Sequence, residues 1–193
     1  MKKIFLLSFL LIGGMLFAQN QIWSIDKSHS NVGFSVSHLV ITDVDGKFTD
    51  YDATLETDAK GVPVKVSATI KTGSINTDNT DRDNHLRSDD FFNSEKFPEM
   101  KFVSKSVKKD GKDKYKITGD LTIRDVTKTV TLDVKFNGQT NDPWGNTKSG
   151  WFATTKINRF DYNLKWNNTI ETGGLVVGKE VTINLKLQFK LNK

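Results

Sequence analysis

The sequence contains no cysteine among its 193 residues. Disulfides are therefore excluded, and the fold must be held together by packing and strand pairing. Lipid attachment to a cysteine after the N-terminal apolar run is excluded for the same reason. The chain also lacks an HExxH metal motif and a GxSxG nucleophile elbow, and it shows no internal repeat or domain linker. These absences favour one domain without a familiar catalytic motif.

Residues 1–18 have the pattern of a secretory signal peptide. Lys2 and Lys3 form a basic start, and an apolar run over residues 4–17 follows, ending at the candidate cleavage point after Ala18. A retained anchor is the alternative interpretation. If the peptide is removed, one mature domain remains over residues 19–193, and the expected location is the periplasm, or outside the cell where there is no outer membrane.

The charge balance is mildly basic. The formal net charge is +5, and Lys2 and Lys3 contribute two of these charges. The other lysines are spread over predicted strands, which indicates a solvated face and no nucleic-acid partner. A patch that faces anionic lipid headgroups is the alternative, and it leaves transient contact with a membrane surface open.

Apolar and polar residues alternate along most of the chain. Val32, Phe34 and Val36 share one face of a predicted strand, and residues 181–191 give the cleanest alternation. A period of two is typical of strands with one buried and one wet face. About eight such strands are joined by turns too short for βαβ crossovers. An antiparallel barrel and a two-sheet sandwich both fit, and the long final strand favours the barrel because closure removes exposed edges.

Turn residues divide these strands. Asp45 followed by Gly46 predicts a turn, with the next strand over residues 47–57. The sequence NDPWG at residues 141–145 is a strong loop signal.

One segment, residues 80–98, breaks the alternation. Its polar beginning predicts a short helix near residues 80–88, with acidic residues in the first turn. Phe91, Phe92 and Phe97 follow before the segment ends at a proline. A non-strand segment with three phenylalanines in a chain of strands predicts a lid or floor for the barrel.

The predicted interior mixes small and large side chains. The small ones are Ala53, Ala68, Gly119 and Ala153. An eight-stranded barrel is either just filled by side chains or holds one small ligand, so both states stay open, and the aromatic segment favours a capped cavity. The wall is almost wholly hydrocarbon and aromatic. Its natural guest is an apolar chain, which gains about 0.8 kcal/mol per buried methylene.

The chain resembles the YceI-like family of exported lipid-binding proteins, in segments that cover essentially the whole mature chain in family order. They are WSIDKSHS from Trp23, VGFSVSH from Val32, GKF from Gly46, RDNHLRSDDFF from Arg82, FP from Phe97, GDLTI from Gly119, TK from Thr127, NRFD from Asn158 and VGKEV from Val177. The resemblance implies a lipocalin-like antiparallel barrel with a long apolar tunnel for polyisoprenoid chains, and homodimers. One departure is Asp161-Tyr162-Asn163, where members often carry an Asp-Phe-Gly type segment.

We therefore predict an exported, non-enzymatic protein, without a cofactor, that sequesters or transports a long-chain isoprenoid-type lipid, polyprenyl or quinone-like. The alternative is an interaction module with a filled barrel that acts through its surface or a dimer interface. The predicted cavity-lining residues are Phe34, Val36, Phe48, Ile70, Leu86, Phe91, Phe92, Phe102, Leu121, Ile123 and Phe160. The candidate head-group or mouth residues are Arg82, His85, Arg87 and Trp144.

Two constellations contain residue types used in metal or nucleophilic sites. His29, His38 and His85 lie far apart in the sequence, so they make a metal site only if the fold gathers them. Asp26, Ser28 and His29 supply the residue types of a hydrolase triad within one short stretch. For each histidine, structural hydrogen bonding is the favoured role.

The polar group Arg82, Asp83, His85 and Arg87 has three interpretations. It caps and fastens the aromatic segment, contacts a phosphate-bearing head group, for which arginine is suited, or forms an acid/base cluster. The last interpretation corresponds to an enzyme that acts on a lipid or quinone, and it is the least favoured. Trp144 would either touch a membrane interface or gate the tunnel.

Overall fold

The structure is a computed structural model of the chain, and it describes residues 19–169 and 173–192. The predicted signal peptide, residues 1–18, lies outside the described residues. Within the described ranges, no helix is both long and apolar enough to span a membrane.

Strands make up most of the described chain. They are β1 (Gln21–Ile25), β2 (Asn31–His38), β3 (Thr42–Phe48), β4 (Tyr51–Thr57), β5 (Pro63–Lys71), β6 (Ile75–Asn76), β7 (Glu99–Lys109), β8 (Lys114–Ile123), β9 (Val126–Asn141), β10 (Thr147–Asn158) and β11 (Val177–Leu191). The helical elements are the short 3-10 helices η1 (Lys27–His29), η2 (Thr72–Ser74) and η3 (Arg159–Tyr162), and the α-helix α1 (Thr80–Arg87).

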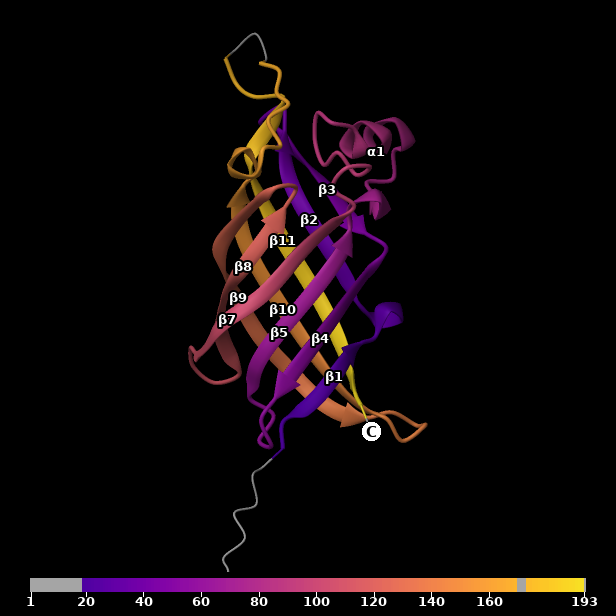
Figure 1. Cartoon of the computed structure of the whole chain (residues 1–193), viewed down its shortest axis with the longest axis vertical. Coiled ribbons are helices and arrows are strands. Elements are labelled where there is room, and N and C mark those ends of the chain that lie inside the picture. Colours follow the sequence, from indigo (N-terminus) through magenta and orange to yellow (C-terminus); the bar gives the residue numbers. More distant parts are fainter. Residues whose placement is uncertain (1–18, 170–172, 193) are drawn as a thin grey trace, which may run out of the picture.

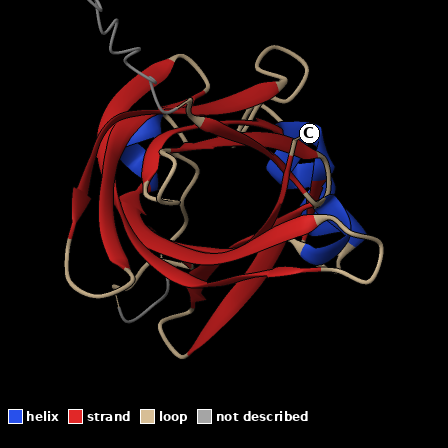
Figure 2. Ribbon diagram, turned by 90° about the horizontal axis from the view of Figure 1, so that it is seen from below, coloured by secondary structure: helices blue, strands red, loops and turns tan. Residues whose placement is uncertain are grey.

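The sheet closes on itself. β1, β4, β5, β7, β8, β9, β10 and β11 are hydrogen-bonded in that order, and a β1–β11 pairing completes the ring of eight strands. β2 pairs with β11 and β3, so it continues the wall beyond η1. Figure 1 shows the barrel from the side, and Figure 2 looks along it. The predicted eight-stranded antiparallel barrel with one short helix is confirmed, and the two-sheet sandwich is excluded.

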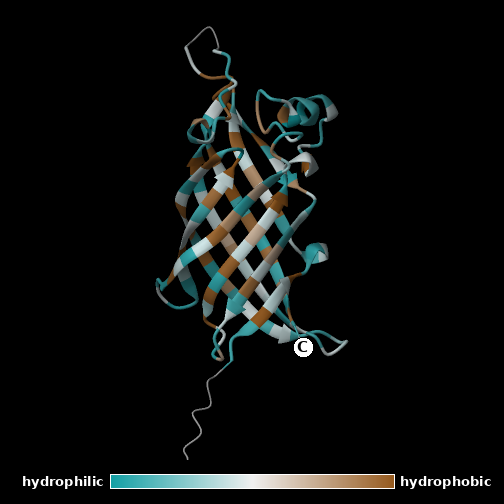
Figure 3. Cartoon of the chain, viewed as in Figure 1, coloured by the Kyte–Doolittle hydropathy of each residue, from teal (hydrophilic) through white to brown (hydrophobic). Residues whose placement is uncertain are grey.

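The predicted alternation places apolar side chains inside the barrel. Along β8, every second residue is buried and the residues that alternate with them are exposed or half-buried; the buried ones are Tyr115, Ile117, Gly119, Leu121 and Ile123. Figure 3 shows the same alternation as teal and brown bands across the strands. Because successive side chains of a strand point to opposite faces, closure collects one apolar row from each strand on the axis.

The turn predicted at Asp45 and Gly46 is wrong. β3 runs through both residues, and the chain reverses earlier, at Leu39 and Val40. Gly46 lies opposite Phe34 in the β2–β3 ladder, and a Cβ atom there would come within 2.3 Å of Phe34 Cζ. The glycine therefore leaves room for an aromatic ring in the wall. The true turn contains none of the usual turn residues, so no local pattern predicts it.

The helix predicted near residues 80–88 is present as α1. Asn79 caps it by accepting a hydrogen bond from the Arg82 backbone N–H at 2.9 Å. The buried Asp83 carboxylate accepts from the backbone N–H and the hydroxyl of Thr77, at 2.9 and 2.6 Å. These bonds fix the helix against the chain that leaves β6, at one end of the barrel (Figure 1).

Gly119 offers a test of how tightly the wall is packed. A Cβ atom there would lie 2.5 Å from the Val103 carbonyl oxygen and 2.6 Å from Phe102 Cζ. We expect Gly119→Ala to lower the free energy of unfolding by about 1–3 kcal/mol, because backbone and ring must both move. Gly73→Ala is the matched control, since nothing lies within 4 Å of its Cβ position. Urea unfolding compares the two variants, and equal losses would contradict this description of the wall.

Candidate functional site: an apolar cavity in the barrel

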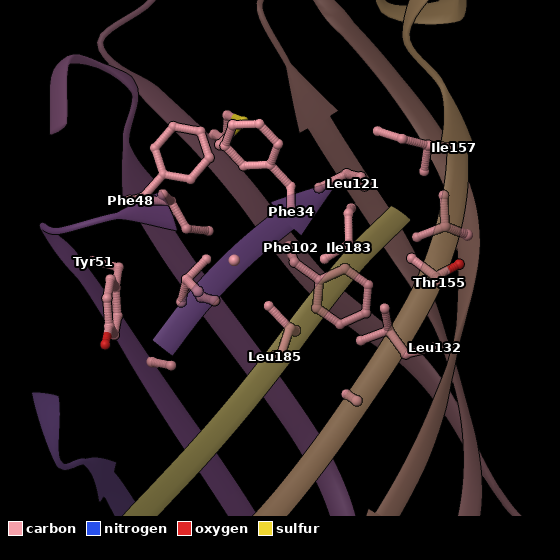
Figure 4. A pocket seen from close by; sticks show the side chains of 18 of the residues that line it. Phe34, Phe48, Tyr51, Phe102, Leu121, Leu132, Thr155, Ile157, Ile183 and Leu185 are labelled. Atoms are coloured by element: carbon pink, nitrogen blue, oxygen red, sulfur yellow. The ribbon is translucent and has the colours of Figure 1, made fainter. Parts of the chain in front are cut away.

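A cavity of about 220 Å³ lies inside the barrel. Residues from each strand of the closed ring line it, and hydrocarbon and aromatic side chains dominate the wall (Figure 4). Among the polar wall residues, Tyr51 donates its hydroxyl to the Ser30 carbonyl at 2.9 Å. Thr155 and Arg159 are further polar residues on the wall. The interior is thus suited to an apolar guest and offers few polar partners.

The structure places ten of the eleven predicted lining residues in this wall. They are Phe34, Val36, Phe48, Ile70, Leu86, Phe91, Phe92, Phe102, Leu121 and Ile123. Figure 4 shows Phe34, Phe48, Phe102 and Leu121 around the space. Their contact with a ligand stays a prediction.

Phe160 is the exception, and its placement in the wall is wrong. The inward row of β10 runs through Thr155 and Ile157 and continues with Arg159, so the next residue points elsewhere. The Phe160 ring instead lies against the Arg159 guanidinium, 4.4 Å from ring centroid to Cζ. The next inward position after Ile157 is therefore occupied by Arg159 and not by Phe160.

Several wall residues were missed by the sequence prediction. They include Tyr51, Leu132, Ile157, Ile183 and Leu185. The alternation of β4, β9 and β11 carried the signal for most of them, because each lies on the apolar row of its strand. Arg159 had no such signal, since a charged residue is predicted to face water.

Arg159 is buried, with 4% of its surface exposed, and it lines the cavity at the η3 end. Its guanidinium donates to four backbone carbonyls at 2.7–3.0 Å, those of Gly178, Leu164, Trp166 and Val177. Burial lowers the pKa of this guanidinium. The side chain ties η3, the chain after it and the start of β11 together, and it gives this end of an otherwise apolar wall a positive charge.

The segment of residues 80–98, here called the cap, covers the same end. Its side chains Leu86, Phe91 and Phe92 line the cavity. The Phe92 ring meets Phe48 edge-on, with 5.7 Å between ring centroids. Phe97 lies outside the wall, and the Arg124 guanidinium covers its ring at 5.3 Å. Phe91 and Phe92 of the cap therefore form part of the cavity surface, whereas Phe97 fastens the cap to the barrel.

The polar cap residues predicted as head-group contacts fasten the cap. Arg82 donates to the Thr77 hydroxyl and carbonyl at 2.7 and 2.8 Å. Arg87 donates to backbone carbonyls of η2 and β6, both at 2.9 Å. His85 pairs with Asp90 at 2.8 Å. None of the three is in the cavity wall, so the structure places them in the fastening role and does not bring them to the cavity.

Trp144 lies in the loop between β9 and β10 and is 81% exposed. In Figure 1 this loop is at the end of the barrel opposite α1. The structure therefore does not bring Trp144 near the cap or near Arg159.

The histidines do not converge. Within residues 19–169 and 173–192, no group of three His, Asp or Glu side chains has the arrangement to hold a metal ion. His29 lies on η1, and its Nδ1–H donates to the Asp26 carboxylate at 3.1 Å. Ser28 contributes its backbone N–H to the same carboxylate at 3.2 Å. The Asp26–His29 pair thus caps η1, and the other partners of Asp26 connect η1 to neighbouring strands.

Asp26 joins the ends of three elements. Its carboxylate accepts from Lys148 Nζ at 2.6 Å and from Gln188 Nε2 at 3.1 Å, which links η1 to β10 and β11. This link lies where the partner of β11 changes from β1 to β2. The cluster therefore belongs to the closure of the barrel.

The departure at Asp161-Tyr162-Asn163 is accommodated. Asn163 adopts the left-handed conformation, with φ of 63° and ψ of 18°, which glycine and asparagine tolerate best. Tyr162 is 1% exposed, and its hydroxyl has no hydrogen-bond partner among the described residues. Burial raises its pKa to about 12. The Tyr162 hydroxyl is thus a buried polar group without a hydrogen-bond partner among the described residues, in the same short helix as Arg159.

An antiparallel barrel of this size around an apolar cavity defines a lipocalin-like barrel protein. Residues 23–189 match the YceI-like domain, and the chain belongs to the YceI-like family.

Relatives cover nearly the whole chain. The UPF0312 protein SAS2572 of Staphylococcus aureus (strain MSSA476) is 38% identical over 173 residues, which is 89% of this chain and 98% of the relative. The crystal structure of the Campylobacter jejuni YCEI protein has a TM-score of 0.72 and 36% identity, over 88% of this chain and 97% of that one. A polyisoprenoid binding domain from Saccharophagus degradans shares the fold, with a TM-score of 0.67 and 15% identity, over 88% and 98% of the two chains.

The Asp26 cluster predicts a pH dependence of stability. Burial raises the pKa of this carboxyl, but the bonds from Lys148, His29 and Gln188 outweigh it and set the pKa at about 2, below the usual 3.8. Because the folded state has the lower pKa, the stabilisation is complete above about pH 4 and is lost as the pH falls towards 2. We expect Asp26→Asn to destabilise the protein at pH 7 and much less at pH 2.5, measured by urea unfolding.

Asp43→Asn removes an exposed carboxylate from β3 and serves as the control. A loss of stability in Asp26→Asn that is the same at both pH values would contradict the assignment.

Proposed function

We propose that this protein binds a long-chain isoprenoid-type lipid, polyprenyl or quinone-like, and sequesters or carries it in the barrel. The apolar cavity is the observation that carries the proposal. Its wall gives a hydrocarbon chain about 0.8 kcal/mol per buried methylene, whereas a polar substrate would lose its hydrogen bonds to water there. The Saccharophagus degradans domain, which has the same fold, is described as binding a polyisoprenoid.

The proposed mechanism is binding by burial, without a covalent step. The polar head of the lipid lies towards Arg159, the cationic residue of the wall, and the chain extends along the apolar rows of the strands. The cavity of about 220 Å³ is smaller than the roughly 300–1,000 Å³ usual for small-molecule sites. A long chain therefore requires wall side chains to move apart, and the cap phenylalanines are placed to do so.

The alternatives are less well supported. A filled barrel that acts through its outer surface does not require an apolar cavity with a charged end. An enzyme acting on the lipid would need reactive groups at the cavity, but the Asp26–His29 pair lies on η1, and the charged cap residues Arg82, His85 and Arg87 lie outside the wall. Binding without catalysis is therefore the function we propose.

Export and self-association complete the proposal. We infer removal of residues 1–18 and residence in the periplasm, or secretion where no outer membrane exists. The family resemblance further implies a homodimer. The intact mass of the exported protein and its size in solution test these two points independently of the ligand.

Native mass spectrometry of the gently extracted protein tests the ligand directly. We expect a mass increment that solvent extraction removes and that fragmentation assigns to a lipid with an isoprenoid chain. The stripped protein should rebind an isoprenoid alcohol in solution. A protein that carries no lipid and takes up no long-chain amphiphile would refute the proposal.

The cap gives a second test. Phe91 and Phe92 line the cavity, whereas His85 pairs with Asp90 outside the wall. We expect Phe91→Ala with Phe92→Ala to speed the release of a bound fluorescent isoprenoid about tenfold or more, because apolar contact with the chain is lost. His85→Ala should change the release rate less.

Phe97→Ala is the matched control, since it removes the same side chain from the same segment but outside the wall. Faster release from His85→Ala or Phe97→Ala than from the double variant would count against the cap as part of the binding surface.

A further inference from the structure

The turn between β2 and β3 exposes adjacent large apolar side chains. Val40 is 69% exposed and Ile41 is 84% exposed. Residues 39–41, here called the apolar tip, include no charged residue, and Thr42 follows them. Neighbouring exposed apolar residues on a soluble surface commonly mark a contact site.

The backbone of the apolar tip is strained. Leu39 and Val40 have φ of 53° and 65°. Two successive left-handed residues define the hairpin turn that asparagine and glycine normally fill, and a β-branched residue is an outlier there. An Asn-Gly pair would relax the turn and make it more soluble. Strain of this kind is concentrated at functional sites, which makes these side chains candidates for a role outside the fold.

The apolar tip is continuous with the wall of the cavity. The Leu39 N–H donates to the Val176 carbonyl at 2.9 Å, and His38 pairs with Val177. Val177 lines the cavity, and so does Val36 on β2. The tip therefore projects from the same end of the barrel as Arg159 and the cap (Figure 1).

We propose that the apolar tip inserts into a lipid bilayer and holds this end of the barrel at the membrane from which the lipid guest is taken up. The inference rests on the proposed function, because a guest of that class resides in a bilayer. A hairpin tip with these few apolar side chains is too small for a stable protein interface, which buries about 800 Å² per partner. A bilayer accepts apolar side chains of any shape, and the apolar tip itself carries no charged side chain. The exposed carboxylate of Asp43, two residues further on, limits the insertion to the tip.

Vesicle flotation with phosphatidylcholine tests the contact. Val40→Asn with Ile41→Ser keeps the turn, because asparagine tolerates the left-handed region. We expect the variant to lose about tenfold or more in partition to vesicles, independent of salt concentration. Uptake of an isoprenoid alcohol from the vesicles should slow by a similar factor, whereas binding of the same alcohol from solution should be unchanged.

Trp144→Ser is the control, since it removes an equally exposed apolar side chain from the opposite end of the barrel. A wild-type protein that does not bind vesicles overturns the inference. Loss of vesicle binding in Trp144→Ser alone, or wild-type binding that disappears in high salt, also overturns it, because the contact then lies elsewhere or depends on lysines. Vesicle binding through the tip without uptake of any lipid would refute the proposed function and leave the contact standing.

Discussion

Closure of the strand ring is the constraint on which the other features depend. The pairing of β1 with β11 closes a ring of eight strands and directs one apolar row from each strand of the ring towards a common axis. Since β1 ends after only a few residues, β2 continues the pairing with β11 beyond η1. The Asp26 carboxylate holds this junction to β10 and β11. The junction between β1 and β2 is thus stabilised by charge-assisted hydrogen bonds.

The two ends of the barrel differ chemically. At one end, the cap adds phenylalanines to the wall, Arg159 supplies a buried charge, and the turn at Val40 and Ile41 exposes apolar side chains. The other end carries the loop with Trp144. This asymmetry gives the cavity a direction, which the proposed lipid orientation and the proposed membrane contact both use. The same end therefore carries both Arg159, proposed to face the lipid head group, and the apolar tip, proposed to enter a bilayer.

Arg159 has two roles in the fold. Its bonds to four backbone carbonyls order η3 and the start of β11. The same bonds keep the guanidinium buried beside the cavity. Tyr162, whose hydroxyl lacks a partner among the described residues, lies in the same short helix. The order of this end thus depends on a buried cation held by backbone dipoles.

The sequence by itself determined the antiparallel strands, favoured their closure into a barrel, and predicted the helix near residues 80–88 and most of the wall. Strand alternation and helix capping are local patterns, and they identified Phe34, Phe102 and Leu121 as inward-facing. Only the tertiary structure decided the rest. Gly46 leaves room for the Phe34 ring on the paired strand, so this glycine does not mark a turn. Arg159 faces inward because the fold brings the carbonyls of the chain after η3 and of the start of β11 together around it. Cavity volume depends on how all strands close together, which no single stretch of sequence encodes.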